Sequence, residues 1–360
     1  MPEKKKHKRL RFALKMLALV LAALIVLPSA ALLIIRAVNA VRLHIGEGGV
    51  QERIYISLGG YKQYVSIRGR NIGNPVVIFL HGGPGSPVGF LSYLYQPLLE
   101  GDYTFIQWDQ RGCGRTYYKS PSAPLSLDNL LGDLDALVDY ASARFHQPVY
   151  IVGHSWGTVL GLDYASKYPD KIAGYIGIGQ ETDDSESGRL QVQAAEDAAR
   201  AAGHDPDSAR MEELYAASKP FGDPAFDAAQ LMELYGLENR YLDPGAKSET
   251  LPALVSPDFG WDDLRYQLLL MRDIKGHFVR QIPLMQAVTD FVPPQRLAAP
   301  AALIGGENDY TCSAVLAKKY ADTLGISFYE IQKSGHSPMF DNPKVFAETL
   351  KEAITNLQKS

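Results

Sequence analysis

The sequence predicts an α/β fold in which a mostly parallel sheet is covered by helices on both faces. Short apolar runs of strand length recur along the chain, and most are rich in Val, Ile, Phe or Tyr. Stretches with helical periodicity separate the later runs from one another. Strands that are apolar on both faces belong to sheets buried between two helix layers. No period of roughly 20 to 50 residues repeats, which argues against a solenoid.

Composition and charge limit the classes of function. The 360 residues are 46% hydrophobic and 21% charged, as is usual for a globular protein. The formal net charge is −4, but residues 1–15 alone carry seven Lys or Arg and one Glu, so the rest of the chain is strongly acidic. An acidic body without a basic stripe argues against a nucleic-acid partner.

The N-terminus predicts a membrane anchor. A basic tail over residues 1–15 precedes an apolar run over 16–35, interrupted only by Pro28 and Ser29. Twenty helical residues span roughly 30 Å, the thickness of a hydrocarbon core. We therefore expect a transmembrane helix at 16–36 with the tail in the cytoplasm, the rest of the chain outside it, and a cell-membrane location. A cleaved signal peptide and a buried core helix are the alternatives.

Eight runs are expected to form the strands of the sheet. A Gly59-Gly60 turn joins the first two as a hairpin, and helical stretches at 128–145, 159–168 and 314–324 follow later ones. The predicted strands are residues 53–58, 63–68, 76–80, 103–108, 149–152, 175–178, 301–304 and 326–331.

A helical insertion interrupts this alternation after the sixth strand. Residues 180–297 are rich in Ala, Glu, Asp, Leu, Tyr and Pro and have helical periodicity, for example at 209–217 and 261–272. We expect them to form a cap on a core made of residues 50–179 and 298–358. Such a cap would lie over the carboxyl ends of the strands, where open sheets bind ligands.

The motif Gly153-His154-Ser155-Trp156-Gly157 predicts a nucleophilic serine. It lies between a predicted strand and a predicted helix, where a sharp turn holds the hydroxyl at the helix N-terminus in strained backbone dihedrals. Glycines on both sides let the strand and the helix approach each other closely.

A serine nucleophile needs a base, and the base needs a carboxylate to orient it. His336 stands in a glycine and serine loop after the last predicted strand, and Asp309 follows the strand before it. Glu307 is a competing acid. The order Ser155, Asp309, His336 at successive strand ends is typical of the α/β-hydrolase fold, with an eight-stranded sheet.

The turn HGGPG, residues 81–85, predicts an oxyanion hole. It follows the strand at 76–80, and its glycines let backbone N–H groups approach a developing negative charge. We expect the amides of Gly83 and Trp156 to form the pair. A phosphate-binding loop is disfavoured because Pro84 lacks an N–H group and no Lys-Ser or Lys-Thr pair follows.

HGGPG at 81–85, WDQRGCGRT at 108–116 and GHSWG at 153–157, together with Asp309 and His336, resemble the proline iminopeptidase family of α/β hydrolases. The resemblance implies a serine peptidase that releases an N-terminal residue, often proline, from short peptides without a metal or a cofactor. Members hold the substrate amine with acidic residues of the cap. In this chain the sequence after the sixth predicted strand is GIGQETDDSESGR, which departs from the stretch usual in the family at that place. Glu181 is a candidate substrate-binding residue, and a solvated acidic loop is the alternative.

Two further expectations concern the WDQRGCG segment. Asp109 and Arg111 are expected to anchor the loop beside the oxyanion turn through a charge-assisted pair. Cys113 and Cys312 are expected to remain separate thiols, because the strands before them lie four positions apart in the usual strand order, about 19 Å.

Three functions remain in competition. The first is a membrane-tethered aminopeptidase that acts on small peptides outside the cytoplasm. The second is an esterase or amide hydrolase with the same triad and another small-molecule substrate, because the fold supports many reactions. A binding module without catalysis is disfavoured because Ser155, Asp309 and His336 are all present.

Overall fold

The computed structural model describes residues 2–220, 223, 225–243 and 248–359. Side chains before Phe12, which include most of the predicted basic tail, and the cap residues 221–222, 224 and 244–247 lie outside the described part. The chain divides into two compact units, which are described separately. One comprises the residues up to His44 together with Ser248–Phe259, and the other comprises the rest.

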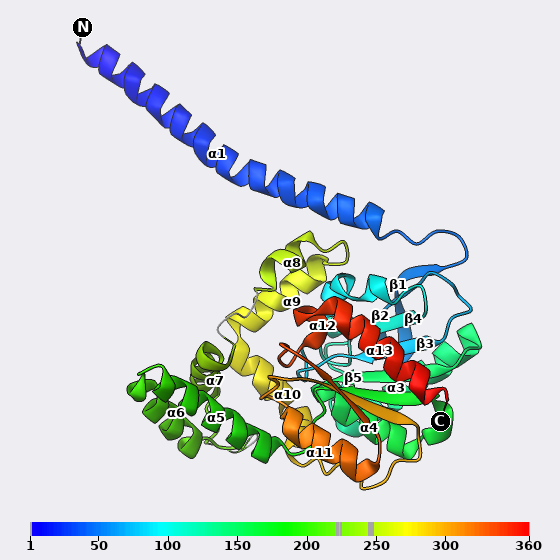
Figure 1. Ribbon diagram of the computed structural model, residues 1–360. Coiled ribbons are helices and arrows are strands. Elements are labelled where there is room, and N and C mark those ends of the chain that lie inside the picture. Colours follow the sequence, from blue (N-terminus) through cyan, green and yellow to red (C-terminus); the bar gives the residue numbers. More distant parts are fainter. Residues whose placement is uncertain (1, 221–222, 224, 244–247, 360) are drawn as a thin grey trace. The chain divides into compact units, whose positions relative to one another are not determined.

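The larger unit is built on an eight-stranded sheet, as the sequence predicts (Figure 1). The strand order is β1-β2-β4-β3-β5-β6-β7-β8, and only β2 runs antiparallel to both of its neighbours. The order changes direction around β3, so the carboxyl ends of β3 and β5 border the crevice in which such sheets bind ligands. The strands are β1 Val50–Leu58, β2 Tyr61–Gly69, β3 Val76–Leu80, β4 Thr104–Trp108, β5 Val149–His154, β6 Gly174–Ile178, β7 Ala301–Gly306 and β8 Ser327–Ile331.

Two helix layers bury the sheet. One face packs against α3 (Leu127–Phe145), α4 (Trp156–Lys167) and α11 (Ala314–Leu324). The other packs against α12 (Pro338–Asp341) and α13 (Pro343–Leu357), beside the 3₁₀ turns η1 (Gly89–Leu94) and η2 (Gln96–Leu98). Two short elements, α2 (Gly114–Lys119) and η3 (Pro169–Lys171), lie in the connections after β4 and α4.

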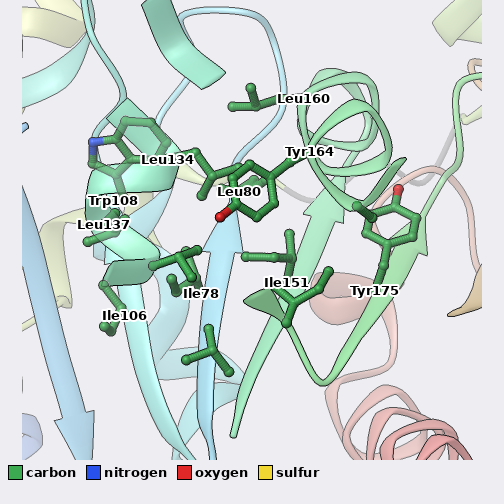
Figure 2. Close-up of a cluster of buried hydrophobic side chains, with 14 of the residues drawn as sticks. Ile78, Leu80, Ile106, Trp108, Leu134, Leu137, Ile151, Leu160, Tyr164 and Tyr175 are labelled. Carbon is green, nitrogen blue, oxygen red and sulfur yellow. The ribbon is translucent and has the colours of Figure 1, made fainter. Parts of the chain in front are cut away.

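Strand β3 is buried on both faces, which explains why its sequence is apolar throughout. Ile78 and Leu80 contribute to the core under α3 and α4, as Figure 2 shows, whereas Val77 and Phe79 contribute to the core under α13. Successive side chains of a strand point to opposite faces, so a strand covered on both faces has no position for a polar residue. Each fully buried side chain of this size stabilises the fold by about 1.5–3 kcal/mol.

The insertion after β6 is helical, with α5 (Asp184–Ala201), α6 (Asp205–Ala217), α7 (Ala228–Leu242), α9 (Trp261–Arg272) and α10 (Ile274–Thr289) in the larger unit. Helices α5, α6 and α7 share a small core of their own. Asp183 begins α5 as its N-cap, because its carboxylate accepts a hydrogen bond from the Glu186 amide at 2.9 Å.

The smaller unit pairs α1 (Pro2–Arg42) with α8 (Thr250–Val255). Arg36 donates a hydrogen bond to the carbonyl of Phe259, and Asn39 Nδ2 donates to that of Val255 at 3.0 Å. The stretch Ala23–Arg42 is long and apolar enough to cross a membrane, and none of it is buried. A transmembrane helix and a signal sequence both meet this description; a buried core helix does not.

Candidate active site

Ser155 occupies the turn between β5 and α4. Its backbone has φ 54° and ψ −125°, and its amide donates to the carbonyl of Ile178 at 3.0 Å. A Cβ on Gly153 would lie 2.4 Å from the Gly157 carbonyl oxygen, and a Cβ on Gly157 would lie 2.3 Å from that of Leu80. Both flanking glycines are therefore required by backbone packing, which leaves the serine to carry the strained conformation.

Asp309 and His336 meet at the same edge of the sheet. Asp309 follows β7, His336 follows β8, and His336 Nδ1 is 3.0 Å from each carboxylate oxygen of Asp309. Asp309 is buried and also accepts a hydrogen bond from the Cys312 amide at 3.0 Å. Glu307, the competing acid, is exposed and accepts a hydrogen bond from the Lys333 amide at 2.8 Å.

The contact with Asp309 determines the protonation behaviour of His336. Burial disfavours the charged imidazolium, but the Asp309 carboxylate outweighs burial and raises the pKa of His336 above its ordinary value. Nδ1 carries a proton when it donates to the carboxylate, so Nε2 of the neutral ring is left as an acceptor. Such a ring can serve as a general base.

A short chain of contacts links the serine to this pair. The Ser155 side chain lies near the thiol of Cys312, the residue whose amide binds Asp309. Between described residues there is no hydrogen bond from Ser155 to the imidazole of His336. The ring of His154 packs beside His336: its centroid is 4.9 Å from that of His336, and its Nε2 is 2.9 Å from the His336 carbonyl.

The predicted oxyanion groups lie on the two turns that border Ser155. A Cβ on Gly82 would lie 3.1 Å from the Cβ of Ser155, which places the HGGPG turn against the nucleophile. Trp156 is the first residue of α4, and Gly83 precedes Pro84 through a cis peptide bond. Within the described chain, neither the Gly83 nor the Trp156 amide donates to a protein acceptor.

Gln110, which the sequence analysis did not single out, ties these two turns together. Its side chain donates to the His81 carbonyl at 3.3 Å and accepts a hydrogen bond from the Trp156 indole at 2.9 Å. Its amide donates to His81 Nε2 at 3.3 Å, which is possible because burial lowers the pKa of His81 to about 4 and keeps the ring neutral. The glutamine of the WDQRGCG motif is the only sequence signal for this role.

The expected pair between Asp109 and Arg111 is wrong. Arg111 instead binds Asp133 of α3 through two hydrogen bonds of 2.7 Å and lies over the ring of Tyr61. Asp109 Oδ2 accepts a hydrogen bond from the Arg115 amide at 2.8 Å. Long-range packing brings α3 within reach of the guanidinium, and a carboxylate with both oxygens available binds it in a bidentate manner.

Glu181 does not lie in a solvated loop. It is 6% exposed, its Oε1 accepts a hydrogen bond from the Thr182 amide at 3.0 Å, and its Oε2 is 3.4 Å from the Cys312 thiol. Burial, together with the nearby charge of Asp184, raises the pKa of Glu181 to about 7. Because the same thiol also lies near Ser155, Cys312 connects Glu181 to the region of the nucleophile.

A second buried acid comes from the cap. Glu238 of α7 is 2% exposed, accepts a hydrogen bond from Gln191 at 2.7 Å, and has a pKa raised by burial to about 7. Tyr235, one turn earlier, is within electrostatic range of Glu238, Asp184 and Cys312. Glu238 was missed because no motif marks it; its only signal is its position four residues after Leu234, on the buried side of the helix.

Comparison with known proteins identifies the class that this fold and this arrangement define. The model of the alpha/beta hydrolase family matches residues 77–349, and the chain belongs to that family. Relatives named aminopeptidase and proline iminopeptidase confirm the resemblance to the proline iminopeptidase family. The probable aminopeptidase YbaC of Bacillus subtilis (strain 168) is 27% identical over 310 residues, which are 82% of this chain and 93% of YbaC.

Two further proteins agree with this placement. The proline iminopeptidase of Clostridioides difficile (strain 630) is 30% identical over 124 residues, 34% of this chain and 41% of that protein. The crystal structure of the proline iminopeptidase of Mycobacterium smegmatis superposes with a TM-score of 0.58 at 18% identity, over 85% of this chain and 98% of that one. At this identity the superposition supports the fold alone.

Proposed function

We propose that this protein is a serine aminopeptidase that releases an N-terminal residue, of the proline type, from short peptides. The observation that carries the proposal is the buried carboxyl group of Glu181, whose Oε2 is 3.4 Å from the Cys312 thiol beside Ser155, together with a second buried acid of the cap, Glu238 on α7. Buried acids without cationic partners favour binding of a positive group, and a free α-amine provides one. The relatives named aminopeptidase and proline iminopeptidase support the same class.

The mechanism assigns one role to each group. The Ser155 hydroxyl attacks the carbonyl carbon of the first residue as the imidazole of His336 takes its proton. The amides of Gly83 and Trp156 stabilise the resulting oxyanion. His336, oriented by Asp309, then protonates the departing amine, and a water molecule hydrolyses the acyl-enzyme by the same route.

The raised pKa values of the two acids suit this task. Burial raises the pKa of Glu181 and of Glu238 to about 7, so each carboxyl group holds its proton more firmly than an ordinary glutamic acid. An arriving ammonium favours the carboxylate form, so binding draws protons off these acids and replaces their lost hydration. A neutral substrate end lacks this interaction and binds more weakly.

We also propose the location and partners that the sequence suggests. The apolar helix α1 would anchor the protein in the cell membrane, with the catalytic unit outside the cytoplasm. The substrates would then be small extracytoplasmic peptides, and the negative charge of the body argues against nucleic acid as a partner.

Glu181→Gln tests the proposal. With prolyl-β-naphthylamide we expect KM to rise about tenfold or more, because the neutral amide attracts the ammonium less strongly. Glu186→Gln is the matched control, since Glu186 lies five residues further on in α5 and pairs with Arg189 at the surface. An unchanged KM in Glu181→Gln, or equal rates on the free and the N-acetylated substrate, would contradict the assignment of the amine site.

A second function, hydrolysis of an ester or another amide, is compatible with the same triad. Wild-type protein that cleaves p-nitrophenyl acetate far faster than prolyl-β-naphthylamide would favour it. Ser155→Ala must abolish both reactions under either proposal, which separates the enzyme from contaminating hydrolases.

A further inference from the structure

Helix α10 carries buried polar atoms that the described protein leaves without partners. Both the Oε1 and the Nε2 of Gln281 lack a hydrogen bond, and so does the Nδ1 of His277. Gln281 is 0% exposed and His277 is 5% exposed. A buried polar group without a partner destabilises a fold by about 1–3 kcal/mol, so a carboxamide with neither end satisfied calls for a ligand.

These atoms lie against the oxyanion turn. A Cβ on Gly85 would be 2.7 Å from His277 Cε1 and 2.8 Å from Gln281 Cδ. Tyr266 of α9 holds the same glycine, because its hydroxyl donates to the Gly85 carbonyl at 2.8 Å. Gly85 is three residues from Gly82, which touches Ser155, so it lies within about 11 Å of that contact.

The chemistry of these atoms favours a neutral polar ligand. A carboxamide presents one acceptor and two donor hydrogens, which together match the N–H and C=O of a peptide group. Burial and the nearby charge of Arg280 together lower the pKa of His277 to about 4, although Asp273 acts in the opposite direction. His277 is therefore uncharged at neutral pH and can exchange one hydrogen bond with a neutral group.

The position assigns this ligand to one side of the scissile bond. In the proposed function, the amino end of the substrate binds Glu181, on the loop after β6, and Glu238, on α7. Gln281 and His277 lie on a different helix and border the oxyanion turn from the cap side. They are therefore available to the part of the substrate that leaves.

We propose that Gln281 and His277 form a subsite that binds the peptide group following the scissile bond. The inference rests on the proposed aminopeptidase function and adds its substrate class: peptides with a second amide, rather than simple aminoacyl amides. Gln281 and His277 act as specificity residues, and neither takes part in bond cleavage.

The test compares two substrates on the full-length protein in detergent. Prolyl-glycinamide has a second amide, whereas prolyl-β-naphthylamide has none. In Gln281→Met we expect the ratio of kcat/KM for the first to that for the second to fall about tenfold or more. The variant should also melt at a higher temperature than the wild type, since it removes an unpaired buried polar group. Gln286→Met, an exposed change of the same kind on α10, is the control and should keep the wild-type ratio.

The outcomes separate this inference from the proposed function. A ratio within about twofold of the wild type, or a lower melting temperature with an unchanged ratio, overturns the subsite and leaves the aminopeptidase standing. Wild-type protein that cleaves neither prolyl substrate overturns both. If Gln281→Met does not fold, Gln281→Glu keeps the size of the side chain but replaces its two N–H donors by one O–H at most, and the same fall in the ratio is required of it.

Discussion

Ser155 holds the main backbone strain of the site. Its φ of 54° with ψ of −125° lies in a region that L-residues other than glycine avoid, which costs about 1–3 kcal/mol. The close packing of Gly153 and Gly157 on neighbouring carbonyls maintains this conformation. The strained turn thus fixes the position of the hydroxyl and lowers the stability of the fold locally.

Replacing the serine in two ways separates strain from chemistry. Ser155→Ala and Ser155→Gly should both lower kcat/KM by about a thousandfold or more, because the nucleophile is lost. Ser155→Gly should melt at a higher temperature than Ser155→Ala, because glycine adopts the strained dihedrals without a Cβ clash. Thermal unfolding of the two variants measures the difference, and an alanine variant at least as stable as the glycine variant would contradict the strain.

The pH dependence of activity should report His336. The base must be neutral to accept the serine proton, and Asp309 raises the pKa of His336. We therefore expect kcat/KM to rise with pH along a limb centred above the ordinary histidine value of about 6.5. Asp309→Asn should move this limb to lower pH and slow the reaction about a thousandfold or more. A profile from pH 5 to 9 checks both, and a limb that stays in place in Asp309→Asn would argue against the pairing.

At the scale of elements, the packing of α10 on the HGGPG turn couples the cap to the oxyanion hole. Gly85 has φ +81° and has no room for a side chain beside His277 and Gln281. The space between α10 and the HGGPG turn accommodates only a glycine at position 85. A change at this residue therefore affects the cap and the active site together.

Gly85→Ala should consequently impair both stability and catalysis. The strained φ and the collision with α10 should lower the free energy of unfolding by about 2 kcal/mol or more. Displacement of the turn should reduce kcat, because the Gly83 amide shifts with it. Gly132→Ala in the exposed part of α3 meets nothing within 4 Å and is the control, expected to stabilise by about 0.5–1 kcal/mol. Urea unfolding and initial rates measure the two effects.

At the scale of the whole molecule, the apolar helix α1 and the catalytic unit are separable. The strands of the sheet and the helices that carry the proposed site all belong to the unit that begins at Ile45. Helix α1 contributes no residue to that site. Its contacts to the carbonyls of Val255 and Phe259 lie within the smaller unit.

Removal of residues 1–44 should release the protein from the membrane. We expect the full-length chain in the membrane fraction, extractable by detergent only, and the shortened chain in the soluble fraction with kcat/KM within about threefold of the full-length value. Fractionation followed by rate measurements checks this. The N-terminus of the protein expressed from the full-length sequence is also determined. If it begins just after Ala40, the helix is a cleaved signal and the anchor is overturned.

Local pattern was sufficient for the sheet and for the motif residues. The apolar run at β3 and the helical pattern at α11 predicted both elements with their observed ends, because alternation and burial act over neighbouring residues. The strand at 149–152 extends two residues further, to His154, because Gly153 pairs with β3 and β6 and His154 pairs with β6, contacts that the local sequence does not reveal. Ser155, Asp309 and His336 were likewise found from the turns that follow their strands.

The sequence by itself determined the class of fold, the helical insertion and the three residues proposed for catalysis, because each depends on periodicity or on a turn within a few residues. Only the tertiary structure decided that Asp133 binds Arg111, that Glu181 contacts the Cys312 thiol, and that Gln281 lies against Gly85. These contacts join residues far apart in the chain, and no local pattern encodes them. Their energies come from burial, which exists only once the cap and the sheet have packed together.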